Sequence, residues 1–334
     1  MKFLKVDKVS KTYSGNEKPA VSGLAFSMKR GEIVSFAGAS GSGKSTLMKM
    51  IGGLISPEKG AIHFQGKALD KPEDKLIPGE EGIKMVFQDL RLMPNHTVEE
   101  NIKYPLLLFD KDYQNERTAE LLEVCHLKEY KRRLPRELSG GQQQRLALGK
   151  TLAEDPTLLL MDEPFSNLDP IVKNKLIVDV SEIIRSQQLS LIMVTHDTQD
   201  ALMLSDKIGF MSEGKLVQYD SPFNIYNKPK SIEIAEFFGS VNVFTKAEFQ
   251  QIFNCSLDIG DNKKVVVRTE SFQASFQSDM LRLEGVVLGA FFKGSGYLIK
   301  LKVGSHLLDV FANDVLKIGD NVPFYVDRHK IIVI

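Results

Sequence analysis

The first two thirds of the chain alternate short apolar runs with stretches of helical periodicity. The runs at residues 33–37, 158–161 and 191–194 are almost wholly apolar, which is typical of strands buried on both faces of a parallel sheet. Between them, apolar residues recur at intervals of three or four and predict amphipathic helices. These stripes are Leu47, Met50, Ile51 and Leu54, and then Val172, Leu176, Val180, Ile183 and Ile184. The pattern predicts an α/β domain in which helices surround a largely parallel sheet.

Two later regions depart from this pattern. Between about residues 89 and 155 the sequence is helical and charged, which predicts a helical subdomain inserted into the sheet domain. From residue 239 onward, short β-rich runs at 265–267, 285–289, 297–301 and 331–334 are separated by Gly, Asn and Asp. Such spacing is typical of a small barrel or sandwich. We therefore expect an α/β cassette over residues 1–238 and a small all-β domain over residues 239–334.

The composition is that of an ordinary globular protein and argues against several functional classes. The 334 residues include 43 basic and 43 acidic side chains, so no basic field favours a nucleic-acid partner. The two cysteines, Cys125 and Cys255, give no disulfide framework, which indicates a reducing compartment. Charges interrupt the apolar residues of the N-terminus, and no apolar run approaches the ~20 residues that span a bilayer. We expect no secretory leader, and we expect any role at a membrane to depend on a partner.

A glycine-rich segment at residues 38–45 matches the phosphate loop G-x-x-x-x-G-K-[ST], between a predicted strand and a predicted helix. Its backbone N–H groups and the helix N-terminus suit the phosphates of a nucleoside triphosphate. We expect Lys44 to reach the β- and γ-phosphates and Ser45 to bind Mg²⁺. The alternative is a chance glycine-rich turn, which the flanking strand and helix disfavour. The predicted nucleotide contacts here are Gly38, Ala39, Ser40, Gly41, Ser42, Gly43, Lys44, Ser45 and Thr46.

Two carboxylates, Asp162 and Glu163, directly follow the apolar run at residues 158–161. Beside a phosphate loop, Asp162 suits Mg²⁺ and Glu163 suits a general base that polarises the attacking water. Two acids after a strand are otherwise usually a helix N-cap or a solvated turn. The presence of the phosphate loop in the same chain favours the catalytic interpretation.

A second motif opens a predicted helix that runs to about residue 154. It consists of Ser139, Gly140, Gly141 and Gln142. Ser-Gly-Gly alone fits either a serine N-cap or a second anion-binding helix end. The longer match over residues 138–142, followed by Gln-Gln-Arg, favours the second interpretation.

Residues 38–45, 138–142 and 158–163, in that order along the chain, resemble motifs of the ATP-binding subunits of ABC transporters. The resemblance covers about residues 1–238. The resemblance implies a P-loop NTPase cassette with a RecA-like sheet core and a helical subdomain. It also implies that Tyr13 stacks on adenine, that Gln88 senses Mg²⁺ and the attacking water, and that His196 contacts the γ-phosphate. The alternatives are surface packing for Tyr13 and a structural role for His196. The implied catalytic residues are Glu163, His196, Gln88 and Lys44, and the implied Mg²⁺ ligands are Ser45, Gln88 and Asp162.

The same resemblance implies a site shared between two subunits, with ATP and Mg²⁺ as cofactors. The residues that would face the ATP of the partner are Ser139, Gly140, Gly141, Gln142 and Asp169, the last within a segment (residues 166–169) that crosses the contact. ATP would close a head-to-tail homodimer and hydrolysis would reopen it. The implied partners are two transmembrane permease subunits and, indirectly, an extracytoplasmic solute-binding protein. The chain would then lie peripherally on the cytoplasmic face of the inner membrane.

The C-terminal region resembles, on shorter motifs, the OB-like TOBE domain of importer ATPases. Residues 239–244 and 267–270 carry this resemblance, with Thr269 where the family commonly has proline. Importers of this group take up ferric iron, polyamines, sulfate, molybdate or sugars, and ferric iron or a polyamine is the expected cargo. The domain could bind a regulator, pack against a second copy, or do neither.

Several alternatives stay open at this level. Soluble ABC ATPases that act on DNA or ribosomes usually have coiled coils or two cassettes, which this sequence lacks. A phosphate-loop kinase would leave residues 138–142 unexplained. Leu90, Leu92 and Met93 could either offer apolar surface to a partner helix or pack in the core. The pair at residues 149–150 is Gly-Lys where the family commonly has alanine-arginine, and the sequence assigns no role to it.

Overall fold

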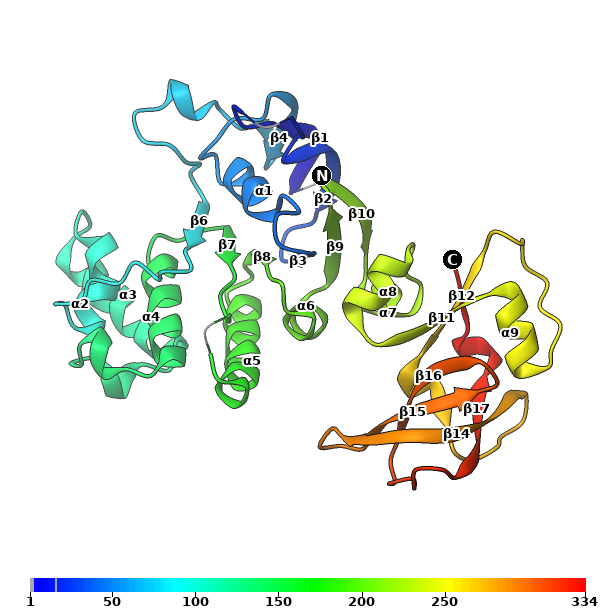
Figure 1. Cartoon of the computed structure of the whole chain (residues 1–334). Coiled ribbons are helices and arrows are strands. Elements are labelled where there is room, and N and C mark those ends of the chain that lie inside the picture. Colours follow the sequence, from blue (N-terminus) through cyan, green and yellow to red (C-terminus); the bar gives the residue numbers. More distant parts are fainter. Residues whose placement is uncertain (1–2, 16, 167) are drawn as a thin grey trace. The chain divides into compact units, whose positions relative to one another are not determined.

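The computed structural model describes residues 3–15, 17–166 and 168–334 (Figure 1). Met1, Lys2, residue 16 and Asn167 lie outside the described residues, and Asn167 belongs to the predicted segment 166–169. The chain divides into two compact units, Met1–Pro222 and Phe223–Ile334. The sequence placed the domain boundary at residue 238, so the structure assigns the segment between these two positions to the second unit.

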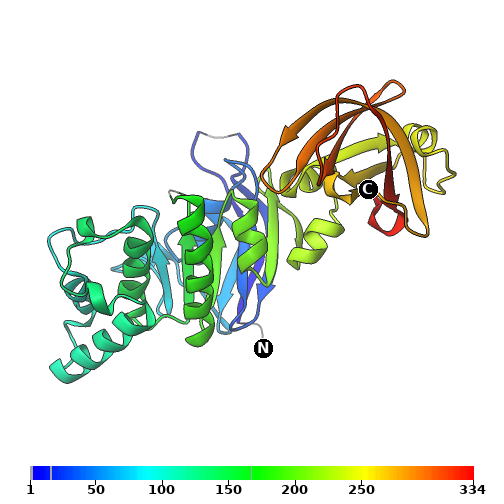
Figure 2. The ribbon, with the colours of Figure 1, turned by 90° about the horizontal axis from the view of Figure 1, so that it is seen from below.

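Two sheets form the frame of the first unit (Figures 1 and 2). An antiparallel sheet has the order β2-β1-β4-β5, from Val21–Met28, Leu4–Lys11, Lys59–Phe64 and Lys67–Ala68. A second sheet has the order β10-β9-β3-β8-β7-β6, from Lys215–Asp220, Lys207–Ser212, Ile33–Ala37, Ser190–Val194, Leu158–Asp162 and Ile83–Val86. Every residue of β3 and β8 is buried, as the uninterrupted apolar runs predict. Only the edge strand β10 runs antiparallel to its neighbour.

The register of this second sheet aligns the ends of four strands. Phe36 pairs with Val194, Asp162 pairs with the same Val194, and Val86 pairs with Met161. Because the strands are parallel, the loops that follow β3, β8, β7 and β6 leave the sheet at one edge. Ligands of open parallel sheets bind at this edge, and every strand-end site residue predicted from the sequence follows one of these four strands.

Helices follow the strands, and three of them form the helical region. The helix α1 spans Lys44–Ile51, α5 spans Pro170–Ser186 and α6 spans Thr198–Leu204. Residues 89–155 contain α2 (Val98–Lys103), α3 (Lys111–Val124) and α4 (Gly140–Leu152), joined by short 3-10 turns. None of the helices in the described ranges is long and apolar enough to cross a membrane.

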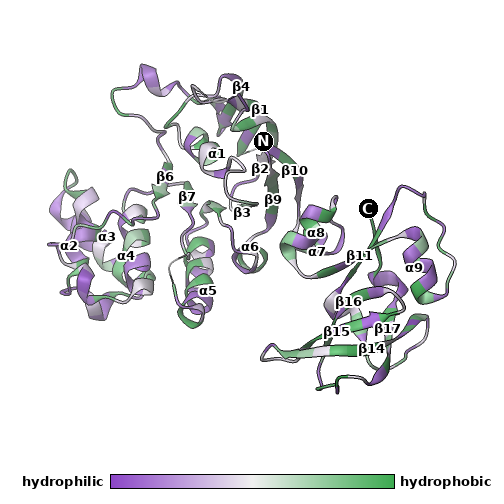
Figure 3. Cartoon of the chain, in the orientation of Figure 1, coloured by the Kyte–Doolittle hydropathy of each residue, from purple (hydrophilic) through white to green (hydrophobic). Residues whose placement is uncertain are grey.

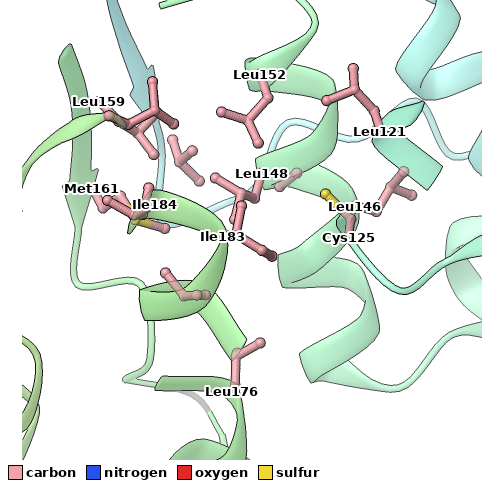
Figure 4. Packing of buried hydrophobic residues seen from close by; sticks show 14 of the residues in the cluster. Leu121, Cys125, Leu146, Leu148, Leu152, Leu159, Met161, Leu176, Ile183 and Ile184 are labelled. Carbon is pink, nitrogen blue, oxygen red and sulfur yellow. The ribbon is translucent and has the colours of Figure 1, made fainter. Parts of the chain in front are cut away.

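One apolar core joins the helical region to the sheet. Figure 4 shows side chains of α3, α4, α5 and β7 packed together, among them Leu148, Ile183 and Met161. Burial of this size fixes the start of α4, the start of α5 and the end of β7 relative to one another. Val172 was predicted to lie on the buried stripe of α5, but it is exposed in the first turn, close to Gly141.

The second unit places two antiparallel sheets around a common core. One sheet has the order β11-β12-β18, from Val241–Thr245, Lys264–Arg268 and Ile332–Val333. The other has the order β13-β17-β14-β15-β16, from Phe272–Gln273, Asn321–Asp327, Met280–Phe292, Tyr297–Val303 and His306–Ala312. Along β14, buried Leu281 and Leu283 alternate with exposed Arg282 and Glu284, and Figure 3 shows polar and apolar residues on this strand.

This unit also contains three helices that the sequence analysis did not assign to it. They are α7 (Pro222–Asn227), α8 (Ile232–Phe238) and α9 (Lys246–Phe253). Helix α9 begins with a capping box between Thr245 and Glu248, a sequence signal that the β-rich pattern around it obscured. Its Phe249 and Phe253 then pack into the same core as the strands.

A buried arginine explains why α7 and α8 belong with the β-strands. Arg268, at the end of β12, is only 3% exposed. Its guanidinium donates hydrogen bonds to the carbonyl of Tyr226 at 2.5 Å and to the carbonyl of Ala235 at 3.2 Å. The same guanidinium lies 3.5 Å from the centre of the Tyr226 ring. The planar fork of arginine suits this combination of stacking and paired acceptors.

We predict that Arg268→Met lowers the free energy of unfolding by about 2 kcal/mol, because hydrogen bonds from a charged group are lost and the carbonyls stay buried. Denaturant unfolding measures this loss. The matched control is Arg282→Met on β14, whose side chain is 59% exposed and should change stability little. Equal losses in the two variants would contradict a special role for Arg268.

Candidate functional site

The loop between β3 and α1 packs so closely against neighbouring backbone that two of its positions require glycine. Gly38 has φ 147°, and a Cβ there would lie 2.1 Å from the carbonyl oxygen of Met211. Gly43 has φ 99°, and a Cβ there would lie 2.1 Å from the carbonyl oxygen of Ala20. The loop is thus held in a fixed shape by two segments distant in sequence, with its N–H groups at the start of α1.

Lys44 lies inside this loop. Its side-chain ammonium donates to the carbonyl oxygens of Gly38 and Ala39, both at 2.8 Å, and to the hydroxyl of Ser42 at 3.1 Å. Burial lowers the pKa of Lys44, while the nearby carboxylates of Glu163 and Asp162 oppose part of that change. The ammonium of Lys44, the backbone of the loop and the helix N-terminus together suit an anion.

The two acidic residues at the end of β7 lie in different environments. Burial raises the pKa of Asp162, the charge of Glu163 adds to this effect, and a hydrogen bond from Ser45 opposes it. Glu163 adopts the left-handed backbone conformation with φ 46°, and its N–H donates to the carbonyl of Val194 at 2.9 Å. Left-handed backbone at a residue other than glycine is uncommon and occurs often at functional sites. Here it directs the chain away from the sheet immediately after Asp162.

The structure brings His196 and Glu163 together. His196 follows β8, and its Nδ1 lies 3.2 Å from Oε1 of Glu163. The histidine side chain is 59% exposed, so it remains accessible at the edge of the sheet. Adjacent parallel strands thus supply an acid and a histidine to one location.

Tyr13 lies beside the first turn of α1. Its hydroxyl is 3.4 Å from the hydroxyl of Thr46, and its side chain is exposed. Both residues were predicted to contact the nucleotide, and the structure places them next to each other near the phosphate loop. An exposed aromatic ring here is available for stacking on a base.

Gln88 is exposed in the turn that follows β6, and β6 is the strand next to β7 in the sheet. The following Leu90 and Arg91 both adopt left-handed backbone, with φ 56° and 45°. The ammonium of Lys150 on α4 donates to the carbonyl of Arg91 at 2.8 Å. The sequence assigned no role to Lys150, and no local signal could have revealed this contact across 59 positions of the chain.

The residues of the second motif gather at the start of α4. The N–H of Gln142 donates to the hydroxyl of Ser139, and the N–H of Ser139 donates to Gln142 Oε1 at 2.9 Å, so the helix begins with a capping box. The cap thus satisfies the N–H of Gln142, while the N–H groups of Gly140 and Gly141 have no acceptor within the helix. A Cβ on Gly140 would lie 2.9 Å from a methyl carbon of Leu168.

Asp169 caps the neighbouring helix α5 and accepts the N–H of Ile171 at 2.9 Å. The starts of α4 and α5 therefore lie together, because Leu168 and Val172 approach the two glycines of the second motif. Figure 1 shows α4 grouped with α2 and α3, whereas α1 stands beside β3 and the antiparallel sheet. The structure thus separates the predicted site residues into a phosphate-loop group and a group at the starts of α4 and α5.

Comparisons with known proteins agree with this arrangement. The family model "ABC transporter" matches residues 21–166. The putrescine transport ATP-binding protein PotG of Escherichia coli is 39% identical over 245 residues, which are 72% of this chain and 63% of that protein. The spermidine/putrescine import ATP-binding protein PotA of Borrelia garinii subsp. bavariensis is 31% identical over 98% of this chain and 97% of its own length.

Solved structures give the same family. The chain matches cbiO1 of Clostridium perfringens, part of the ABC transporter complex cbiONQ, with a TM-score of 0.63 and 28% identity over 67% of this chain and 90% of that one. It also matches the ATP-binding cassette MJ0796, in a dimeric post-hydrolysis state bound to ADP and Pi. That match has a TM-score of 0.55 and 30% identity over 66% of this chain and 98% of the other. The chain therefore belongs to the ABC transporter family and is an ATP-hydrolysing subunit of an importer.

Proposed function

We propose that two copies of this chain bind ATP between them, each supplying one half of both sites. The observation that carries this proposal is the separation of the two predicted groups within one copy. Lys44 and its loop form one anion site, and the glycines at the start of α4 form another, beside Asp169. A helix N-terminus with N–H groups that lack helical acceptors attracts phosphate oxygens. ATP held between the two groups would join two subunits, and hydrolysis would release them.

Mg²⁺ fits the oxygen groups beside the phosphate loop. Ser45 lies near enough to Asp162 to oppose the rise in the pKa of its carboxyl, and Gln88 follows the adjacent strand, so the three residues come from neighbouring segments. A hydroxyl, a carboxylate and phosphate oxygens are ligands that Mg²⁺ prefers. The bound ion would neutralise phosphate charge during phosphoryl transfer. These residues would hold and orient it, while the ammonium of Lys44 would balance phosphate charge.

Glu163 is proposed as the general base. Its carboxylate is positioned by the left-handed backbone of the residue, by the hydrogen bond of its N–H to Val194, and by His196 at 3.2 Å. It would accept the proton of the water that attacks the γ-phosphate. His196, being exposed beside it, would hold the γ-phosphate in line with that water. Neither residue is needed for the initial binding of ATP, which depends on the phosphate loop.

The segment after Gln88 would carry the nucleotide signal into the helical region. The side chain of Asn101, fully buried on α2, accepts the N–H of Met93 at 2.8 Å and donates to the carbonyl of His96 at 2.9 Å. Lys150 holds the same segment from α4. Side chains of two helices, α2 and α4, therefore hydrogen-bond to the backbone of this segment. A displacement of Gln88 would move the helical region as a body.

A membrane partner is proposed to dock beside this segment. The sequence offered Leu90, Leu92 and Met93 as possible partner contacts, and of these the two leucines pack against the core of the chain. A cavity of about 560 Å³ instead adjoins Phe87, the residue before Gln88. Its lining includes Leu54 and Met85 from the sheet domain and Thr151 from α4. A short permease helix in this cavity would touch both parts and so respond to their relative movement. The chain would then lie peripherally on the cytoplasmic face of the membrane, served by two permease subunits and an extracytoplasmic solute-binding protein.

A polyamine is proposed as the cargo, with ferric iron as the second candidate. PotA of Borrelia garinii, named for spermidine and putrescine, matches this chain nearly end to end, including the C-terminal unit. An Fe(3+) ions import ATP-binding protein, FbpC of Fusobacterium nucleatum, is 36% identical over 72% of this chain and 64% of its own length. The carnitine transport ATP-binding protein OpuCA of Listeria monocytogenes also matches 96% of this chain, but only 82% of its own length. The match with PotA covers 97% of that protein, and this fuller coverage favours the polyamine.

Glu163→Gln is predicted to abolish turnover while preserving ATP binding, because the amide keeps the shape of the side chain but accepts no proton. We expect the rate of ATP hydrolysis to fall by at least about a hundredfold and an ATP-bound dimer to accumulate. Steady-state ATPase assays, nucleotide titration and light scattering measure the three effects. Turnover within a few-fold of the unmodified chain would remove Glu163 from the role of base.

The docking site and the cargo can be tested together in the importer complex, purified from its membranes and reconstituted in vesicles. We expect a solute-binding protein loaded with polyamine to stimulate ATPase activity, and one loaded with ferric iron to have little effect. Ile77→Asp places a charge in the lining of the cavity, on a side chain that is 80% exposed, and should reduce this stimulation about tenfold.

Leu76→Asp is the matched control, because Leu76 is fully exposed and adjacent in sequence but does not line the cavity. It should leave stimulation unchanged. Equal stimulation in both variants would refute docking in the cavity. Stimulation by the ferric protein alone would refute the polyamine assignment.

A further inference from the structure

A lysine on α5 lies between two carboxylates at the start of α6. Nζ of Lys173 is 2.5 Å from Oδ2 of Asp197 and 2.7 Å from Oδ1 of Asp200. The side chain of Lys173 is only 12% exposed and that of Asp200 only 2%. Figure 1 shows α5 and α6 as separate helices that follow β7 and β8, so this cluster joins two connections of the sheet.

The cluster borders the loop that carries His196. Asp197, the next residue, caps α6 by accepting the N–H of Gln199 at 2.8 Å. Thr195, the preceding residue, accepts the N–H of Asp197 at 3.0 Å, and its hydroxyl lies 3.3 Å from Oδ2 of Asp200. Both neighbours of His196 are therefore fixed by groups that Lys173 holds. The exposed imidazole itself gains its position from this loop and from Glu163.

The charges of the cluster depend on one another. Burial disfavours the charged form of Lys173, but its bonds to Asp197 and Asp200 outweigh this and raise its pKa. Burial raises the pKa of Asp200, and the negative charge of Asp197 raises it further. Removing the single cation would leave two carboxylates close together with one of them buried, so the loop would have to rearrange.

Lys173 also lies one turn from the predicted dimer contact. Its N–H donates to the carbonyl of Asp169 at 2.8 Å in the first turn of α5. Asp169 is the residue proposed to reach the site of the partner subunit. A displacement of the start of α5 would therefore reach the loop of His196 through a single side chain.

We propose that Lys173 is a positioning residue that holds His196 in place and links it to the start of α5. This inference rests on the proposed role of His196 in hydrolysis. Lys173 does not contact the phosphate loop, so it acts on the chemical step through the histidine and leaves ATP binding to other residues. Misplacement of a catalytic group by about 1 Å costs up to about a hundredfold in rate.

The test compares Lys173→Met, Lys173→Arg and Asp197→Asn in steady-state ATPase assays. Methionine keeps much of the length of lysine without its charge, and arginine keeps the charge. We expect Lys173→Met to lower kcat by about tenfold to a hundredfold with KM for ATP within about twofold. Lys173→Arg should recover most of kcat. Asp197→Asn should lower kcat as Lys173→Met does, because it removes one of the two carboxylates that Lys173 binds. Lys173 and Asp200 should remain paired in this variant.

Two controls make the result decisive. Lys175→Met changes an exposed lysine on the same helix and should match the unmodified chain. His196→Ala separates this inference from the proposed mechanism. If His196→Ala loses activity but Lys173→Met and Asp197→Asn do not, the positioning role is wrong and the role of His196 stands. Full activity of His196→Ala overturns both, and failure of Lys173→Arg to recover kcat overturns the positioning role.

Discussion

The parallel register of β3, β8, β7 and β6 is the constraint on which the rest of the structure depends. It places the phosphate loop, the two carboxylates, His196 and Gln88 at one edge of the sheet, although they come from segments up to 158 positions apart. A shift of one residue in any pair would turn the side chains of that strand to the opposite face. The uninterrupted burial of β3 and β8 holds this register in place.

The second group of site residues depends on packing instead of register. The core in Figure 4 joins α4 and α5 to β7, so the glycines of the second motif and Asp169 have fixed positions relative to Asp162. A larger residue at Gly140 or Gly141 would require the side chain of Leu168 or Val172 to shift. Lys150 and Asn101 connect the helical region to the segment after Gln88, and Lys173 connects α5 to the loop of His196.

The sequence predicted those parts of the fold that are determined locally. The strands β3, β7 and β8 and the start of α1 were located to within about a residue, because their apolar runs and glycines leave few alternatives. The predicted stripe of α1 included Leu54, but the helix ends at Ile51 and Gly52 follows it. The assignment of α7 and α8 to the second unit was not predictable, since it depends on Arg268 reaching carbonyls 42 and 33 positions away. For the same reason the sequence did not reveal the contacts of Lys150 and Lys173. It also could not decide whether Leu90 and Leu92 lie in the core or on the surface.

Each nucleotide site is proposed to be built from two subunits, and mixing two inactive variants tests this most directly. Lys44→Ala disables the phosphate loop, and Ser139→Arg blocks the start of α4 by bulk. In a mixed dimer the loop of one subunit and the second motif of the other remain intact, so one complete site survives. We predict that equal mixing restores about a quarter of the ATPase rate, because half of the dimers are mixed and each has one of two sites. A mixture no more active than either variant alone would contradict a shared site.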